Sequence, residues 1–226
     1  MKKLFLFLLL TLTTFADIGT IMVAKGDAQI KRAHKLLPVK NGMDILKGDE
    51  IITKKKARIQ VMLNDDTVIT IGPNSSFSFV DYFFDGSKKS TIKMQANRGF
   101  FRSVTGKIGK IAPQRFKVKT KLATIGIRGT DFSAQIGRTS TSYICNRGEI
   151  TLHFANIQKS VIAGEKALLH LEGTLVKSMS ASAIKKDSKA SKVQEKHIKQ
   201  INLNASDLSD IRENKTELKR IKFNCD

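Results

Sequence analysis

Basic residues at alternate positions are the strongest chemical signal in this sequence. From position 115 to 121 every second residue is Arg or Lys, so a β-strand would project all of them on one side. The surrounding stretch 86–130 holds twelve basic residues and no Asp or Glu. Like charges along a strand repel one another, which costs stability. A bound anion would relieve this repulsion, so the pattern indicates a possible anion-binding surface. The alternative is an ordinary solvated, lysine-rich strand face. The candidate partner-binding residues are Arg115, Lys117, Lys119, Lys121 and Arg128.

No group of residues has the spacing of a catalytic, cofactor or metal site. The histidines are isolated in sequence, at His34, His153, His170 and His197. Asp65 and Asp66 are adjacent, and adjacent strand residues point to opposite faces, so a turn explains them better than acid–base chemistry. No nucleophile elbow, phosphate-binding loop or zinc spacing is present. We therefore expect no enzyme, no cofactor and no metal ion, with an envelope hydrolase as a remote alternative.

The sequence contains two cysteines, Cys145 and Cys225. In an oxidising compartment they could form a disulfide that ties the end of the chain to its body. The closed loop is long, so the chain-entropy model gives about 4 kcal/mol of stabilisation, less any strain. In the alternative, Cys145 is a small buried apolar residue and Cys225 a free thiol.

The elements that must position these residues are short strands. From Ile18 to about Ser178 the dominant hydrophobic period is two, and turn signals recur at short intervals. This pattern predicts an all-β body with many short strands, either solenoid-like or built from two sheets. Predicted structural turn residues are Gly48, Asp49, Gly72, Pro73, Gly126 and Gly129. The last two glycines interrupt an apolar run and predict two short strands joined by a sharp corner.

The first sixteen residues have the pattern of a secretory signal peptide. Lys2 and Lys3 precede a short apolar run, and small residues at Thr14 and Ala16 fit cleavage after Ala16. We therefore expect a periplasmic or secreted chain from Asp17 onward. The alternative is a retained membrane anchor, but the apolar run is shorter than the roughly 20 residues that a spanning helix needs. The formal charge of the chain would fall from +20 to +18 when the two lysines are removed. Export disfavours nucleic acid as the partner of this charge and favours anionic envelope groups.

Composition changes near Ser178, which divides the chain into a β domain at 17–178 and a linker with a helical tail at 179–226. Ser206 is a plausible N-cap of an amphipathic helix of about four turns. Its apolar side would carry Leu208, Ile211, Leu218 and Ile221. We expect this helix to pack against the β body; contact with a partner or a membrane surface is the alternative.

Several turn motifs in order resemble a known family. GDEIITKKKARIQVMLNDDTVITIGPNSSFSF, RFKVKTKLATIGIRGTDF, CNRGEI and AGEKALL together cover roughly 44–169. They resemble the FecR domain, named for the iron-dicitrate sensor of Gram-negative bacteria. The family pattern usually has proline where this chain has Lys121, and often glycine where it has Asp66.

The resemblance implies a periplasmic β domain of binding or sensing type, with no catalytic residues to carry over. The family's best-known members also have an anti-sigma segment and one membrane span. In this chain we expect a cleaved signal peptide instead. We expect a non-enzymatic protein that binds an envelope protein or an anionic envelope polymer. A sensory component that acts with a separate membrane protein is the alternative. Membrane contact would be at most peripheral, and exposed strand edges leave self-association open.

Overall fold

The computed structural model describes residues 17–154, 157–171 and 176–180. The expected signal peptide at 1–16 and almost all of the expected linker and helical tail lie outside these residues. The strands are β1 (Asp17–Lys25), β2 (Ala28–Arg32), β3 (Lys35–Pro38), β4 (Asp44–Leu46), β5 (Glu50–Thr53), β6 (Arg58–Leu63), β7 (Val68–Ile71), β8 (Ser76–Phe83), β9 (Thr91–Val104), β10 (Phe116–Lys119), β11 (Thr124–Ile136), β12 (Ser140–Phe154), β13 (Ile157–Ile162), β14 (Glu165–His170) and β15 (Val176–Ser180). Two short helical turns, α1 (Ile108–Ile111) and η1 (Pro113–Arg115), connect β9 to β10. The all-β prediction is confirmed for the described part of the chain.

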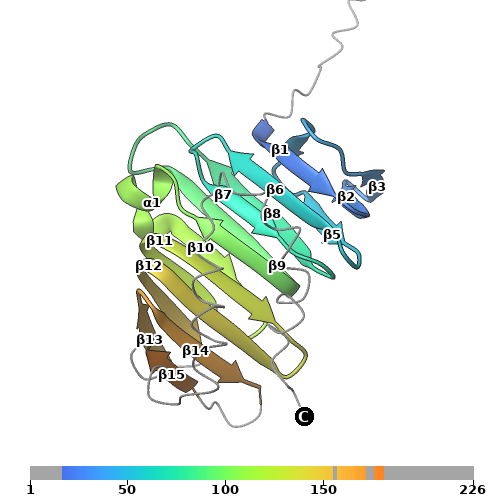
Figure 1. Ribbon diagram of the computed structural model, residues 1–226. Coiled ribbons are helices and arrows are strands. Elements are labelled where there is room, and N and C mark those ends of the chain that lie inside the picture. Colours follow the sequence, from blue (N-terminus) through green and yellow to red (C-terminus); the bar gives the residue numbers. More distant parts are fainter. Residues whose placement is uncertain (1–16, 155–156, 172–175, 181–226) are drawn as a thin grey trace, which may run out of the picture.

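All the strands join one hydrogen-bonded network, which folds over into two faces (Figure 1). Face A runs β4–β1–β6–β7, then the second half of β9, the second half of β11, the first half of β12, β14 and β15. Face B runs β3–β2–β5–β8, then the first half of β9, β10, the first half of β11, the second half of β12, and β13. Thus three long strands, β9, β11 and β12, pass from one face to the other. Neighbouring strands are antiparallel except β9 and β10, which are parallel.

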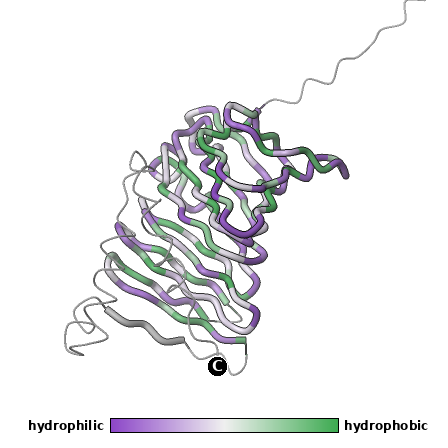
Figure 2. The backbone as a smooth tube through the Cα atoms, turned by 45° about the vertical axis from the view of Figure 1, so that its right-hand side comes forward, coloured by the Kyte–Doolittle hydropathy of each residue, from purple (hydrophilic) through white to green (hydrophobic). Residues whose placement is uncertain are grey.

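The core lies between the two faces and follows from the alternation of apolar and polar residues. Figure 2 shows this alternation along the stacked strands. On face B, the inward side chains of Phe77 and Phe79 are each 1% exposed. The ring of Phe77 lies 5.2 Å from that of Phe101 on face A, and the ring of Phe101 lies 5.8 Å from that of Phe132. Burial of such aromatic pairs contributes both area and favourable ring geometry.

Glycines with positive φ allow the long strands to bend between the faces. Gly99 in β9 has φ +84°, Gly129 in β11 has φ +59°, and Gly148 in β12 has φ +77°. Residues with a side chain rarely adopt this backbone conformation, whereas glycine does so freely. Gly126 lies in the regular part of β11, paired with Lys117 and Thr151. The corner predicted from the sequence therefore falls at Gly129, inside one continuous strand.

The other predicted turn residues lie where strands of the two faces meet. Gly48 has φ +90° and donates its backbone N–H to the carbonyl of Phe79 at 2.7 Å. The carboxylate of Asp49 is 1% exposed and accepts two bonds from Arg32, at 2.8 and 2.7 Å, and one from Leu46 N at 2.8 Å. Gly72 and Pro73 follow β7, and the Gly72 carbonyl accepts a 2.6 Å bond from the Thr53 hydroxyl. These bonds fix the turns from which the faces are built.

Candidate functional site

The candidate basic residues are positioned by β10, which lies in the middle of face B. Phe116 and Val118 point into the core and are both 0% exposed. Lys117 and Lys119 alternate with them and point outward. The inward apolar residues therefore hold the two lysines on the solvent side, as the sequence pattern requires.

Like charges lie beside this strand. Lys117 is in register with Lys93 on β9, and Lys119 is in register with Gln95. Neighbouring strands lie about 4.8 Å apart, and like charges directly opposite each other are destabilising. On the other side, Lys117 faces Gly126, which offers no side chain to compensate it.

The positive charge of Lys93 is compensated by an ion pair, whereas the charges of Lys117 and Lys119 are not. Lys93 Nζ lies 3.1 Å from Asp81 Oδ2, and Lys47 Nζ lies 2.6 Å from Asp81 Oδ1. Hydrogen bonds from Lys47 and then from Lys93 hold the pKa of Asp81 below its usual value. Within the described residues, neither Lys117 nor Lys119 forms an ion pair. These two ammonium groups remain available to an external anion.

The other three predicted residues lie outside β10, so the five do not form one row along a single strand. Arg115 lies in η1, before the strand, and is exposed. Lys121 follows the strand, and its Nζ donates to the backbone carbonyl of Arg138 at 2.9 Å. Arg128 lies on β11, exposed and in register with Glu149. We define the basic row as Lys117 and Lys119 with Lys93 beside them; within the described residues its two β10 lysines form no ion pair.

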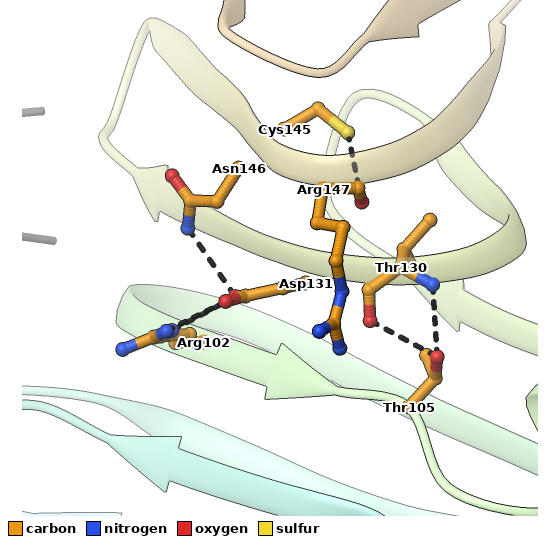
Figure 3. A network of polar contacts seen from close by, with 7 residues as sticks. All are labelled: Arg102, Thr105, Thr130, Asp131, Cys145, Asn146 and Arg147. Atoms are coloured by element: carbon orange, nitrogen blue, oxygen red, sulfur yellow. Dashed lines mark hydrogen bonds and ion pairs between the residues drawn. The ribbon is translucent and has the colours of Figure 1, made fainter. Parts of the chain in front are cut away.

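An ion pair beside the Gly129 corner was not visible in the sequence (Figure 3). Arg102 on β9 binds Asp131 on β11 through two bonds, Nε to Oδ1 at 2.8 Å and Nη2 to Oδ2 at 2.6 Å. The two side chains are 12% and 13% exposed. Asn146 Nδ2 donates to the same carboxylate at 3.2 Å. This charge-assisted, two-bond contact joins β9, β11 and β12 beside the bends at which they pass between the two faces.

The same corner is closed by a threonine pair. The Thr105 hydroxyl accepts from the backbone N–H of Thr130 at 2.9 Å and donates to its carbonyl at 3.0 Å. Thr105 thus satisfies backbone groups at the bend, where the regular strand pairing shifts.

Asp65 is a buried carboxylate rather than only a turn residue. It is 0% exposed and accepts bonds from the Thr67 hydroxyl at 2.8 Å, Ile108 N at 3.1 Å and the Tyr82 hydroxyl at 3.4 Å. Burial raises its pKa above the ordinary value, while the hydrogen bonds from Thr67 and Ile108 act in the opposite direction. Since α1 begins at Ile108, the carboxylate fixes the start of the β9–β10 connection. Its complete burial favours a structural role.

Cys145 is buried in the core of face A. It is 0% exposed, and its Sγ donates weakly to the carbonyls of Arg147 and Gly148, both at 3.4 Å. Burial raises the pKa of this thiol from 9.0 to about 11. Cys225 lies outside the described residues, so a disulfide between the two cysteines remains a prediction.

The thiol of Cys145 is expected to be nearly inert in the folded protein. At pH 8 the raised pKa alone reduces the reactive thiolate about 100-fold, and burial reduces access further. A Cys225→Ser variant isolates this thiol, whose rate of modification by a disulfide reagent is compared in native buffer and in denaturant. Equal rates in the two solutions would show that Cys145 is accessible, contrary to its position in the structure.

Over the described part of the chain, no cluster of three or more His, Cys, Asp or Glu side chains could hold a metal ion. Its helices are also too short and too polar to cross a bilayer. The described chain is thus an all-β domain whose most distinctive surface feature is the basic row.

The domain can be assigned to a family. Residues 49–151 match the family model described as "FecR protein". The chain therefore carries a FecR domain, and the resemblance seen in its turn motifs is confirmed. The match includes the basic row, the Gly129 corner and the Arg102–Asp131 pair. The FecR family is one of non-enzymatic regulators. No curated protein sequence compared with the chain gives a significant match.

Three solved structures align with parts of the chain. Two crystal structures of a proposed anti-sigma factor from Parabacteroides distasonis align with TM-scores of 0.48 and 0.47 and sequence identities of 13% and 14%. Each alignment covers 58% of this chain and 59% of the other, so the chain spans about three-fifths of their length. A structure described as a cell surface anchoring domain aligns with a TM-score of 0.27 and 22% identity, over 27% of this chain and 82% of the other.

Proposed function

We propose that this FecR-domain protein is a non-enzymatic binding protein that recognises an anionic envelope partner through the basic row. The observation that carries the proposal is the outward position of Lys117 and Lys119 beside Lys93, with an ion pair only at Lys93. Bringing an anion to this row would replace like-charge repulsion with attraction.

The strength of such contacts indicates the kind of partner. An exposed ion pair contributes only about 0.2–1 kcal/mol and is screened by salt. Two or three lysines would therefore bind a single small anion weakly. A partner that presents several anionic groups together gains affinity through multivalency. We accordingly favour an acidic protein surface or a polymer bearing phosphates or carboxylates.

The proposed location narrows the available partners. The pattern of residues 1–16 favours export, which would place the domain among lipopolysaccharide phosphates, cell-wall carboxylates and envelope proteins. An exported domain would not meet nucleic acid as its ordinary partner. A membrane contact would be peripheral, through head groups.

Charge reversal at the basic row is expected to weaken binding to the envelope. The Lys117→Glu/Lys119→Glu variant should co-sediment with isolated envelope fractions at least about tenfold less tightly, because it replaces attraction with repulsion. The matched control is Lys54→Glu/Lys55→Glu, which makes the same charge change at the exposed turn between β5 and β6. Equal loss in both variants would mean that only net charge matters, and no loss in the first would refute the proposal.

A sensory role with a separate membrane protein is the second candidate function. It is supported by the FecR domain over residues 49–151, because FecR relatives suggest a signalling role. Crosslinking of the full chain in intact cells, followed by mass spectrometry, distinguishes the two. A single integral membrane protein as the dominant partner would favour relay of a signal, whereas crosslinks to an anionic polymer would favour binding alone.

A further inference from the structure

Face B ends at two edge strands, β3 and β13, and the edge at β13 is open (Figure 1). Among the described strands, β13 pairs only with β12, because the next strand, β14, joins face A. Edge strands offer unpaired backbone groups to other chains, and folded proteins usually protect them by short length, proline or charge. β3 has four residues, starts with Lys35 and ends with Pro38. β13 has six residues, no proline and one charge, at Lys159, so it is the less protected edge.

The side chains of β13 combine one core anchor with exposed apolar residues. Val161 is 0% exposed and packs into the core, whereas Ile157 and Ile162 are 50% and 52% exposed. Residues 158–160 between them are exposed as well. Isoleucine and valine fit the pleated surface of a sheet, so this edge favours the addition of a further strand.

A contact at Ile162 shows which backbone groups face the open edge. The N–H of Ile162 donates to Glu165 Oε2 at 3.0 Å, not to Glu149, which is its register partner on β12. In an antiparallel ladder, the backbone groups of alternate residues point to the same side of the strand. The N–H and C=O groups of Gln158 and Ser160 therefore also point away from β12. Within the described residues these groups have no backbone partner.

We propose that a second copy of this chain pairs with β13 through its own β13, antiparallel and about a two-fold axis at Ser160. In this register Ser160 faces Ser160 of the second copy, Lys159 faces its Val161, and Gln158 faces its Ile162. The two Ser160 residues exchange two backbone hydrogen bonds, as in a hydrogen-bonded pair of an antiparallel ladder. The N–H of Gln158 donates to the carbonyl of Ile162 on each side of the axis. The interface is isologous, so one open edge supplies both halves.

Length and charge select this register among those that two identical strands allow. Paired residues share a side of the sheet, so a two-fold axis must pass through a residue that faces its own copy. Only axes at Lys159 and Ser160 pair five residues of this six-residue strand; any other axis pairs fewer. An axis at Lys159 would place the two lysines directly opposite each other, which is destabilising. The axis at Ser160 keeps the full length and separates the lysines.

This pairing would join face B of both copies into one continuous sheet with the two basic rows on the same outer side. β10 lies three strands from β13, so seven strand gaps of about 4.8 Å separate the two rows by roughly 34 Å along the sheet. A polymer that carries many anionic groups would then contact both rows and gain affinity through multivalency. The dimer goes beyond the proposed binding role, which needs only one copy.

Sedimentation of the reduced, purified chain tests the dimer. The pairing buries one strand edge from each copy, less than a standard interface, so the dimer should be weak and reversible. The weight-average mass should rise from that of one chain toward that of two between about 5 and 500 µM. Ser160→Pro removes the N–H on the axis but no bond to β12, and should weaken the dimer at least about tenfold. The matched control, Ser160→Ala, removes only the hydroxyl that donates to Glu149 Oε1 at 2.6 Å, and should dimerise within about threefold of wild type.

Crosslinking tests the register. In a Cys225→Ser background, Ser160→Cys would bring two thiols together at a Cα separation of about 5.5 Å, which a disulfide can bridge. Lys159→Cys would leave its two Cα atoms about 8 Å apart, beyond that range. With oxidised glutathione as the oxidant, the first variant should crosslink at least about tenfold faster than the second.

Several outcomes would overturn the proposal. They are a chain that stays monomeric up to about 500 µM, a Ser160→Pro variant that dimerises as tightly as wild type, and faster crosslinking through Lys159→Cys. Equal weakening by Ser160→Pro and Ser160→Ala would also refute it, since the hydroxyl and not the backbone edge would then hold the dimer. Slow modification of Cys145 in each variant ensures that a lost dimer does not reflect unfolding. A monomer that still binds the envelope through the basic row would refute the dimer alone.

Discussion

Replacing Gly148 with alanine is expected to reduce the free energy of unfolding by about 4 kcal/mol, or to prevent folding. A Cβ at this corner would lie 2.8 Å from the Arg128 carbonyl oxygen and 3.0 Å from the Gly129 carbonyl carbon, with the Gly129 oxygen closer still. All these atoms are backbone, so no side chain can move aside. The φ of +77° adds its own cost. Urea denaturation of the full chain under reducing conditions measures the change.

Two neighbouring glycines are matched controls for Gly148. A Cβ at Gly129 would meet no atom within 4 Å, so Gly129→Ala should cost only the positive-φ penalty of about 1 kcal/mol. A Cβ at Gly126 would make ordinary contacts of 3.7–3.9 Å in a regular strand, so Gly126→Ala should change stability by less than about 1 kcal/mol. Equal effects at all three positions would show that the backbone of β12 at Gly148 does not approach that of β11 at Gly129 this closely.

Removing Asp131 is expected to destabilise the fold by about 3 kcal/mol. The substitution Asp131→Ala would leave the Arg102 guanidinium, 12% exposed, without its two-bond partner at the corner. An uncompensated, largely buried charge costs more than the intact pair contributes. Thermal or urea unfolding of the purified variant measures this loss.

A double substitution separates the buried charge from the packing around it. Arg102→Met/Asp131→Leu should recover stability to within about 1 kcal/mol of wild type, since it removes both charges. Lys107→Ala breaks the exposed Lys107–Asp66 pair, whose side chains are 59% and 63% exposed, and should have little effect. A double variant as unstable as Asp131→Ala would mean that the pair acts through shape rather than charge.

Local patterns were sufficient to predict an all-β body, but not the length of β9, β11 and β12, which are long strands rather than short ones. The alternation of Phe116 and Val118 with Lys117 and Lys119 is a property of one strand, so the outward position of both lysines follows from the sequence alone. A corner within the Gly126–Gly129 segment was also expected, because glycine in a strand pattern marks a bend. What the pattern did not reveal is that β11 continues through the corner into the other face, since the interruption resembles the end of a strand.

The remaining features depend on contacts between distant residues. Asp131 meets Arg102 across 29 positions only because β9 and β11 pair in one register. The carboxylate of Asp65 is buried because donors arrive from Tyr82 and from Ile108, 43 residues later. The parallel pairing of β9 with β10 likewise requires the turn through α1 and η1. No local periodicity carries this information, so the ion pair at the corner was missed.

The proposed binding role of the basic row is tested most directly by the salt dependence of envelope binding. Co-sedimentation of the wild-type chain, Lys117→Glu/Lys119→Glu and Lys54→Glu/Lys55→Glu is measured over a series of salt concentrations. The account predicts that wild type and the turn control bind more weakly as salt rises, because screening removes the attraction. The row variant should bind weakly at every concentration. A row variant that binds as tightly as wild type, with the same dependence on salt, would contradict it.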